Sequence, residues 1–132
     1  MDKLGLGREM EALVADRWTW YGFKCWMPPR GRQKNLDAPV NRYVSQDIWN
    51  LFDFIAVKPW CPVNLVQVKR KRRTEAEVAL EAIKSFSEAY SAPIASFVVL
   101  WHKERATGAI RFEAWELGML GWMQAGQWSE KA

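Results

Sequence analysis

The sequence predicts a mixed α/β domain in which helices pack against one central β-sheet. Two stretches with helical periodicity, over about 8–21 and 74–90, interrupt five apolar, strand-like segments. The two middle segments, 51–57 and 63–69, are almost continuously apolar, as is typical of strands covered on both faces. Along the chain the elements follow the order α-β-β-β-α-β-β, which predicts a mixed five-stranded sheet flanked by α-helices.

Glycine and proline residues, which end helices and strands, separate the elements of the N-terminal half. The first helix carries apolar residues at helical spacing and is expected to stop at Gly22. A short strand over 23–27 follows and ends at a pair of prolines. The polar segment 30–46 shows little periodicity, and loops of that length in compact domains are usually functional or disordered. We therefore expect a mobile basic loop over about 28–46.

The C-terminal half follows the same logic. Thr74 and Glu77 form a capping box that opens the second helix. Strands are predicted over 95–101 and 109–115. The aromatic tail, about 118–132, is ambiguous: it could close the core of the monomer or form an interface with a second copy.

Length and composition predict a single globular domain over residues 1–132. The chain is 49% hydrophobic and 26% charged, which is typical of soluble proteins. It has no apolar run near the roughly 20 residues that a membrane helix needs, and its N-terminus lacks a signal-peptide pattern. Cys25 and Cys61 with the lone His102 cannot complete a tetrahedral zinc site. We expect a cytoplasmic protein of a bacterial, archaeal or phage-infected cell, with no membrane partner.

Positive charge is concentrated in the middle of the chain. Residues 24–73 hold eleven of the nineteen basic residues and only three acids, a net charge of +8, whereas the remaining residues carry a net charge of −4. Such asymmetry favours a face that binds a polyanion. The alternative is a solvated basic surface without a partner.

Polar residues at the ends of the two middle strands suggest chemistry. Asp53 opens one of these strands, and Gln67 and Lys69 close the next, where they project on the same face. Mg²⁺ prefers hard oxygen ligands and usually keeps several waters. Asp53, the Gln67 amide and the Val68 carbonyl could therefore hold the ion. Lys69 would then orient a water or stabilise a charged transition state.

The order of these motifs resembles the PD-(D/E)xK nuclease superfamily, and more closely the archaeal-type Holliday junction resolvases that also occur in phages. The resemblance covers roughly residues 5–115 and is carried by Gly7-Arg8-Glu9-Met10-Glu11, Tyr21-Gly22-Phe23, Asp53-Phe54-Ile55-Ala56 and Leu65-Val66-Gln67-Val68-Lys69. It implies a restriction-endonuclease-like core and Mg²⁺-dependent cleavage of four-way DNA junctions, with Mn²⁺ able to substitute. It also implies a metal-binding glutamate on the first helix, and the spacing of the family selects Glu11 over Glu9.

One residue departs from the family pattern. Gln67 stands where most members have glutamate, although Mrr-like restriction nucleases also carry glutamine there. The exchange removes a negative charge from the metal site, and Asp47 is either a helper acid or a turn residue. Two alternatives therefore stay open: an Mrr-like endonuclease that acts on duplex or flapped DNA, and a catalytically inactive DNA-binding module.

Basic residues on both sides of the catalytic strands are the expected contacts to the DNA backbone. They are Arg30, Arg32 and Lys34 in the loop, and Arg70, Lys71, Arg72 and Arg73 after the lysine strand. Trp49 and Trp60 could stack on splayed bases, or pack in the core. Symmetric junction cleavage requires two active sites and hence a C2 homodimer. The apolar residues available for its interface are Trp115, Met119, Leu120, Trp122, Met123 and Trp128.

Overall fold

The computed structural model describes residues 3–28, 32–33, 42–43, 48, 51–89 and 94–130. These residues form two helices and eight strands. In chain order they are α1 (Lys3–Trp20), β1 (Lys24–Trp26), β2 (Arg32–Gln33), β3 (Arg42–Tyr43), β4 (Phe54–Val57), β5 (Val63–Arg70), α2 (Arg73–Ala89), β6 (Ile94–Lys103), β7 (Ile110–Gly118) and β8 (Gly121–Glu130).

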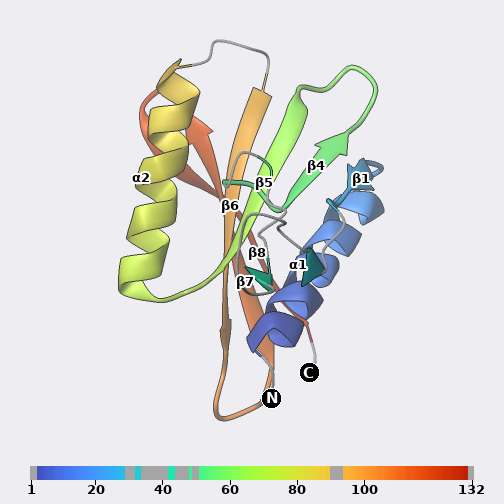
Figure 1. Ribbon diagram of the computed structural model, residues 1–132, viewed down its shortest axis with the longest axis vertical. Coiled ribbons are helices and arrows are strands. Elements are labelled where there is room, and N and C mark those ends of the chain that lie inside the picture. The colour runs from blue at the N-terminus through green and yellow to red at the C-terminus, as the bar shows by residue number, and fades with distance from the viewer. Residues whose placement is uncertain are drawn as a thin grey trace.

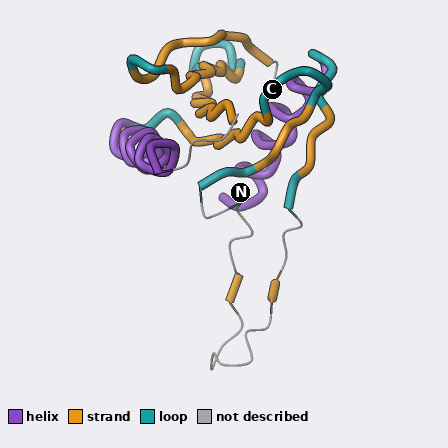
Figure 2. The backbone as a smooth tube through the Cα atoms, turned by 90° about the horizontal axis from the view of Figure 1, so that it is seen from above, coloured by secondary structure: helices purple, strands orange, loops and turns teal. Residues whose placement is uncertain are grey.

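Six of the strands make one mixed sheet in the order β1-β4-β5-β6-β7-β8. β5 and β6 run parallel and are joined through α2, whereas every other neighbouring pair in this sheet is antiparallel. Helices α1 and α2 lie on opposite sides of the sheet (Figure 1). Figure 2, seen from above, shows the same two helices separated by strands. β2 and β3 form a separate two-stranded sheet.

Alternation along β5 divides the core into two layers. Val66 and Val68 pack with Met10 and Val14 of α1 on one face of the sheet. Leu65, on the other face, packs in a second cluster with residues of α2. Because successive strand residues point to opposite faces, β5 contributes to both clusters and is buried from Asn64 to Val68. The expectation of strands covered on both faces is confirmed for β5.

Helix α1 ends as its sequence predicts. Gly22 has a φ of 96°, a left-handed conformation that glycine adopts without a steric penalty. The Gly22 amide donates to the carbonyl of Thr19 at 2.9 Å, and the Phe23 amide donates to that of Trp18 at 3.1 Å. These two bonds form a Schellman motif, which reverses the chain into β1. Neither described helix is long and apolar enough to cross a membrane.

The structure confirms the mixed α/β class and corrects the predicted strand count. The main sheet has six strands instead of five, because the ambiguous tail forms β8 and pairs with β7 along nearly its whole length. An irregularity in this pairing after Ala114 shifts the alternation, so Trp122 packs in the α2 layer and Trp128 in the α1 layer. A single period of two therefore does not run through the whole tail.

Three predicted boundaries also need correction. Helix α2 begins at Arg73, and the Ala76 amide donates to the Arg72 carbonyl at 2.8 Å, so Thr74 lies inside the helix instead of capping it. β4 begins only at Phe54, because a bridge between Ile48 and Phe52 and a bend at Asp53 precede it. The segment 30–46 contains the β2–β3 pair, where no strand was predicted.

Candidate active site

Asp53 lies at the bend where the chain enters β4, and its carboxyl group is fixed by β5. Its backbone amide donates to the Val66 carbonyl at 2.8 Å. Its Oδ2 accepts a hydrogen bond from the Val68 amide at 2.6 Å. The residue is only 3% exposed. A buried carboxylate that accepts a hydrogen bond from a backbone N–H has a defined orientation. Here the pairing of β4 with β5 places Asp53 next to the Val68 amide and so fixes the orientation of its carboxylate.

Glu11 shares a cavity with Asp53. The cavity measures about 210 Å³ and is lined by Arg8, Glu11, Met27, Pro28 and Asp53. Glu11 is 6% exposed although glutamate is rarely buried, whereas Glu9 is exposed. Helical periodicity alone did not separate these two glutamates. In the tertiary structure Glu11 is the buried one of the two, and its role as a metal ligand stays a prediction.

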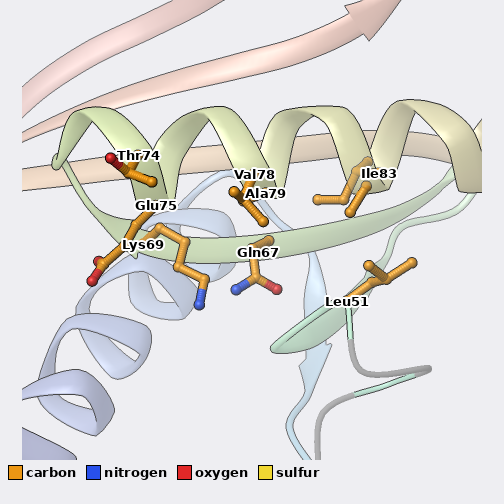
Figure 3. Close-up of a pocket in the computed structure, with 9 residues that line it drawn as sticks. Leu51, Gln67, Lys69, Thr74, Glu75, Val78, Ala79 and Ile83 are labelled. Atoms are coloured by element: carbon orange, nitrogen blue, oxygen red, sulfur yellow. The ribbon is translucent and has the colours of Figure 1, made fainter.

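Gln67 and Lys69 project from β5 into a second cavity, beside α2 (Figure 3). It measures about 300 Å³, and its other lining residues are Leu51, Thr74, Glu75, Val78, Ala79, Ala82 and Ile83. Gln67 is 5% exposed, and its Oε1 has no hydrogen-bond partner among the described residues. Buried side-chain oxygens are normally hydrogen-bonded, so this atom is an unused acceptor. Lys69 is half-buried and lies next to the Gln67 side chain, on the side of its amide nitrogen.

The four predicted site residues therefore form two pairs, one on each side of β5. Glu11 and Asp53 share the cavity beside α1, whereas Gln67 and Lys69 share the cavity beside α2. β5 connects the pairs, because the Val68 amide that holds Asp53 lies between Gln67 and Lys69 in sequence. The Val68 N–H donates to Asp53 and cannot bind a cation. The predicted metal ligand of this residue is its carbonyl oxygen, and that role stays a prediction.

Among the described residues, no group of three or more histidine, cysteine, aspartate or glutamate side chains could hold a metal ion. Glu11 and Asp53 are two carboxylates, and the third predicted ligand is an amide that such a group does not include. Glu11 and Asp53 nevertheless fit Mg²⁺ chemically, because they supply hard carboxylate oxygens to one cavity, whereas the unused acceptor of Gln67 lies in the cavity on the other side of β5. The candidate helper Asp47 lies outside the described residues.

The basic residues at the end of β5 and directly after it have local contacts. The Arg70 guanidinium lies over the Trp101 ring, 5.4 Å from its centroid. Lys71 Nζ bonds to Glu113 at 2.9 Å. Arg72 lies 3.9 Å from the Glu75 carboxylate. All three cations are solvent-exposed, so these contacts leave them accessible to a polyanion at little energetic cost.

The remaining predicted contacts are only partly described. Arg32 belongs to β2, and Arg73 is the first residue of α2; the structure does not describe their side chains. Arg30, Lys34 and Trp49 lie outside the described residues. Trp60 is fully exposed in the turn before β5, whereas Gln67 and Lys69 lie in the other half of that strand. Trp60 therefore does not pack in the core, and stacking on a base stays a prediction.

Two residues near the site were not anticipated. Arg8 borders the carboxylate cavity one helical turn before Glu11, and this spacing was the available signal. Glu75 borders the second cavity together with Lys69, because the crossover after β5 returns α2 over that strand. Comparison of the chain with protein-family models, curated protein sequences and solved structures finds no match.

Proposed function

We propose that this protein is a Mg²⁺-dependent endonuclease with a restriction-endonuclease-like core that cleaves four-way DNA junctions. The observation that carries the proposal is the burial of two carboxylates, Glu11 and Asp53, in one cavity beside the strand that bears Lys69. Burying charged groups is costly, so buried carboxylates are paired with other groups or bind metal ions, and they gather at functional sites. The two carboxylates come from separate elements, so their shared cavity is a property of the fold.

Each residue has a role that its surroundings support. Glu11 and Asp53 would hold the ion in the cavity that they share, and the bound ion would supply charge neutralisation at the phosphate and a more acidic water. The Val68 amide keeps the Asp53 carboxylate in a fixed orientation. Lys69 carries the positive charge that would orient the attacking water or stabilise the additional negative charge on the phosphate. Gln67 lines the cavity on the other side of β5; as a ligand it would add an oxygen without charge, so the ion would be held by fewer negative charges than in most members of the family that the chain resembles.

The four-way junction as substrate follows from the resemblance of the motifs, and so does the symmetric cut that requires a homodimer. The exposed Met119, Leu120 and Met123 at the β7–β8 turn and on β8 support the presence of an interface, because apolar side chains on a solvent-facing edge favour association. Trp122 and Trp128 instead pack against the core of the monomer.

Cleavage of a synthetic four-way junction tests the proposal, with a linear duplex and a flapped duplex of the same sequence as controls. We expect Mg²⁺- or Mn²⁺-dependent symmetric nicks near the branch point of the junction. Equal cutting of the linear duplex would instead indicate the Mrr-like activity. Tight junction binding without cutting at any concentration of either metal would indicate an inactive DNA-binding module.

Variants at Asp53 and Lys69 connect activity to the site. Asp53→Asn keeps an oxygen for the bond from the Val68 amide but loses the charge, so it should abolish cleavage and leave junction binding largely intact. Lys69→Ala should have the same effect. Lys84→Ala is a matched control, because Lys84 is exposed on α2 and lines neither cavity. Cleavage retained by Asp53→Asn would rule out the assignment of the metal site.

A further inference from the structure

The turn between β6 and β7 brings additional positive charge to the end of the molecule that carries the candidate site. β5 runs parallel to β6, with Arg70 paired with Trp101, and β6 continues past this point to Lys103. In Figure 1 this turn lies toward the lower end, as do the first turns of α1 and α2. The first turn of α1 leads into Arg8 and Glu11, and α2 begins directly after the basic residues that follow β5.

Two cations of this hairpin, Lys103 and Arg105, are exposed and have no ion-pair partner among the described residues. The nearby glutamates are bound by other cations. Glu104 pairs with Arg111, and Glu113 pairs with Lys71. The positive charge of Lys103 and Arg105 is therefore available to a partner outside the chain.

Strand alternation puts Lys103 on the same face as Arg70. Trp101 and Lys103 are two residues apart on β6, so their side chains leave the sheet on one face. The Arg70 guanidinium lies over the Trp101 ring on that face, which is also the face covered by α1. Arg70 and Lys103 thus lie on the α1 side of the sheet, as does the cavity that contains Glu11 and Asp53.

Hydrogen bonds hold the hairpin in a defined shape. The Glu104 amide donates to the Ala109 carbonyl, and the Gly108 amide donates to the Glu104 carbonyl, both at 2.8 Å. Gly108 has a φ of 72°, which allows the tight reversal without strain. At the base of the hairpin, the Lys71 amide donates to the Trp101 carbonyl at 2.6 Å. The cations are therefore presented by a structured turn that is attached directly to the end of β5.

We infer that Arg70, Lys103 and Arg105 form a phosphate-binding rim that holds a DNA arm outside the position of cleavage. This inference rests on the proposed function for the identity of the polyanion. The partner is the sugar-phosphate backbone, because the phosphates carry the negative charge of DNA and receive most contacts from lysine and arginine side chains. The charge distribution of the sequence does not reveal the rim, since two of its three cations belong to the part of the chain with a net negative charge.

The test compares two double variants of the full-length protein by fluorescence anisotropy with a synthetic four-way junction, in Ca²⁺ and without Mg²⁺. The rim variant is Lys103→Ala with Arg105→Ala. The control is Lys24→Ala with Lys84→Ala, which removes the same charge from exposed sites on β1 and α2. Because all four side chains are exposed, both variants should keep the urea midpoint of unfolding of the wild type, as urea denaturation would verify.

Loss of two phosphate contacts should reduce the slope of log K against log salt by about 2. The same relation gives a loss of affinity of about 30-fold at about 0.15 M salt and about 200-fold at about 0.05 M. The control should stay within about twofold of the wild type and keep its slope, because its cations lie outside the rim. An unchanged slope in the rim variant, or an equal loss in the control, would overturn the inference.

Single-turnover cleavage at saturating enzyme separates this inference from the proposed function. If the rim acts only in binding, the rim variant should cleave at the wild-type rate once it is saturated. A wild-type protein that does not cut, together with a rim variant that still loses salt slope, would refute the endonuclease and support the rim. A wild-type protein that cuts, together with a rim variant that binds normally, would refute the rim alone.

Discussion

The unpaired oxygen of Gln67 gives a sharp prediction about stability, because the protein contains a matched buried amide. Gln67 and Asn64 are 5% and 6% exposed on the same strand. The Asn64 amide, oriented to suit its neighbours, accepts from Trp18 Nε1 at 3.0 Å and donates to the Pro62 carbonyl at 3.1 Å. Gln67 Oε1 has no partner among the described residues. The two residues thus differ mainly in whether the amide is satisfied.

Replacing each amide by an apolar residue of similar shape should change stability in opposite directions. A buried acceptor without a partner costs about 1–3 kcal/mol, so Gln67→Met should raise the free energy of unfolding by about 1–2 kcal/mol in the absence of metal. That corresponds to roughly 3–10 °C in Tm for a chain of this length. Asn64→Leu removes both hydrogen bonds and leaves the buried Trp18 N–H unpaired, so it should lower stability by about 1–3 kcal/mol.

Urea denaturation in EDTA, with a common m-value, measures both changes. Destabilisation of Gln67→Met by as much as Asn64→Leu would refute the reasoning, because it would mean that the Gln67 amide is already satisfied. Adding Mg²⁺ tests the ligand role separately. At ten times its Kd, an ion that binds only the folded state stabilises the wild type by about 1.4 kcal/mol, and Gln67→Met should lose part of this gain.

Three further predictions concern other parts of the molecule. Glu11→Gln should reduce junction cleavage at least about 100-fold, whereas Glu9→Gln should leave it unchanged, because only Glu11 lines the cavity that contains Asp53. Equal effects of the two variants in a nicking assay would contradict this prediction. Burial, with a smaller contribution from a neighbouring acid, raises the pKa of the Cys25 thiol. Iodoacetamide should therefore label the exposed Cys61 first, and Cys25 should react only as the pH rises above the usual range of a thiol pKa. Equal labelling of both cysteines at neutral pH, measured by mass spectrometry, would disprove this prediction. Leu120→Asp should leave the free energy of unfolding within about 0.5 kcal/mol of the wild type, because the side chain is fully exposed. If a homodimer uses the β7–β8 turn, light scattering should show that this variant is a monomer. A dimer mass that stays unchanged would exclude that interface.

Much of the candidate site could be predicted from local sequence, because its residues occupy the ends of strands with strong apolar patterns. Asp53 precedes β4, and Gln67 and Lys69 lie on one face of β5, as alternation requires. The choice of Glu11 needed more than periodicity, since Glu9 fits the helix equally well. Burial distinguishes them, because α1 packs against the sheet through Met10 and Val14, next to Glu11.

Long-range relationships account for what was missed. The tail was ambiguous because β8 depends on pairing with β7, and the irregularity at Ala114 conceals its alternation. The sequence gives no sign that Lys103 and Arg105 form a basic surface, because the nearby Glu104 and Glu113 offset their charge. Only the pairing of strands shows that these acids are bound by Arg111 and Lys71, which leaves the two cations accessible.

The sequence by itself determined the α/β class, the two helices and the positions of most strands along the chain. It also determined that Gln67 and Lys69 project from the same face of β5. These features depend on periodicity and on residues at element ends, which act over a few neighbours. The tertiary structure decided that Glu11 lies beside Asp53, that the Gln67 oxygen has no described partner, and that the β6–β7 turn extends the basic surface. Each of these depends on contacts between residues far apart in the chain, which the packing of helices and the pairing of strands bring together.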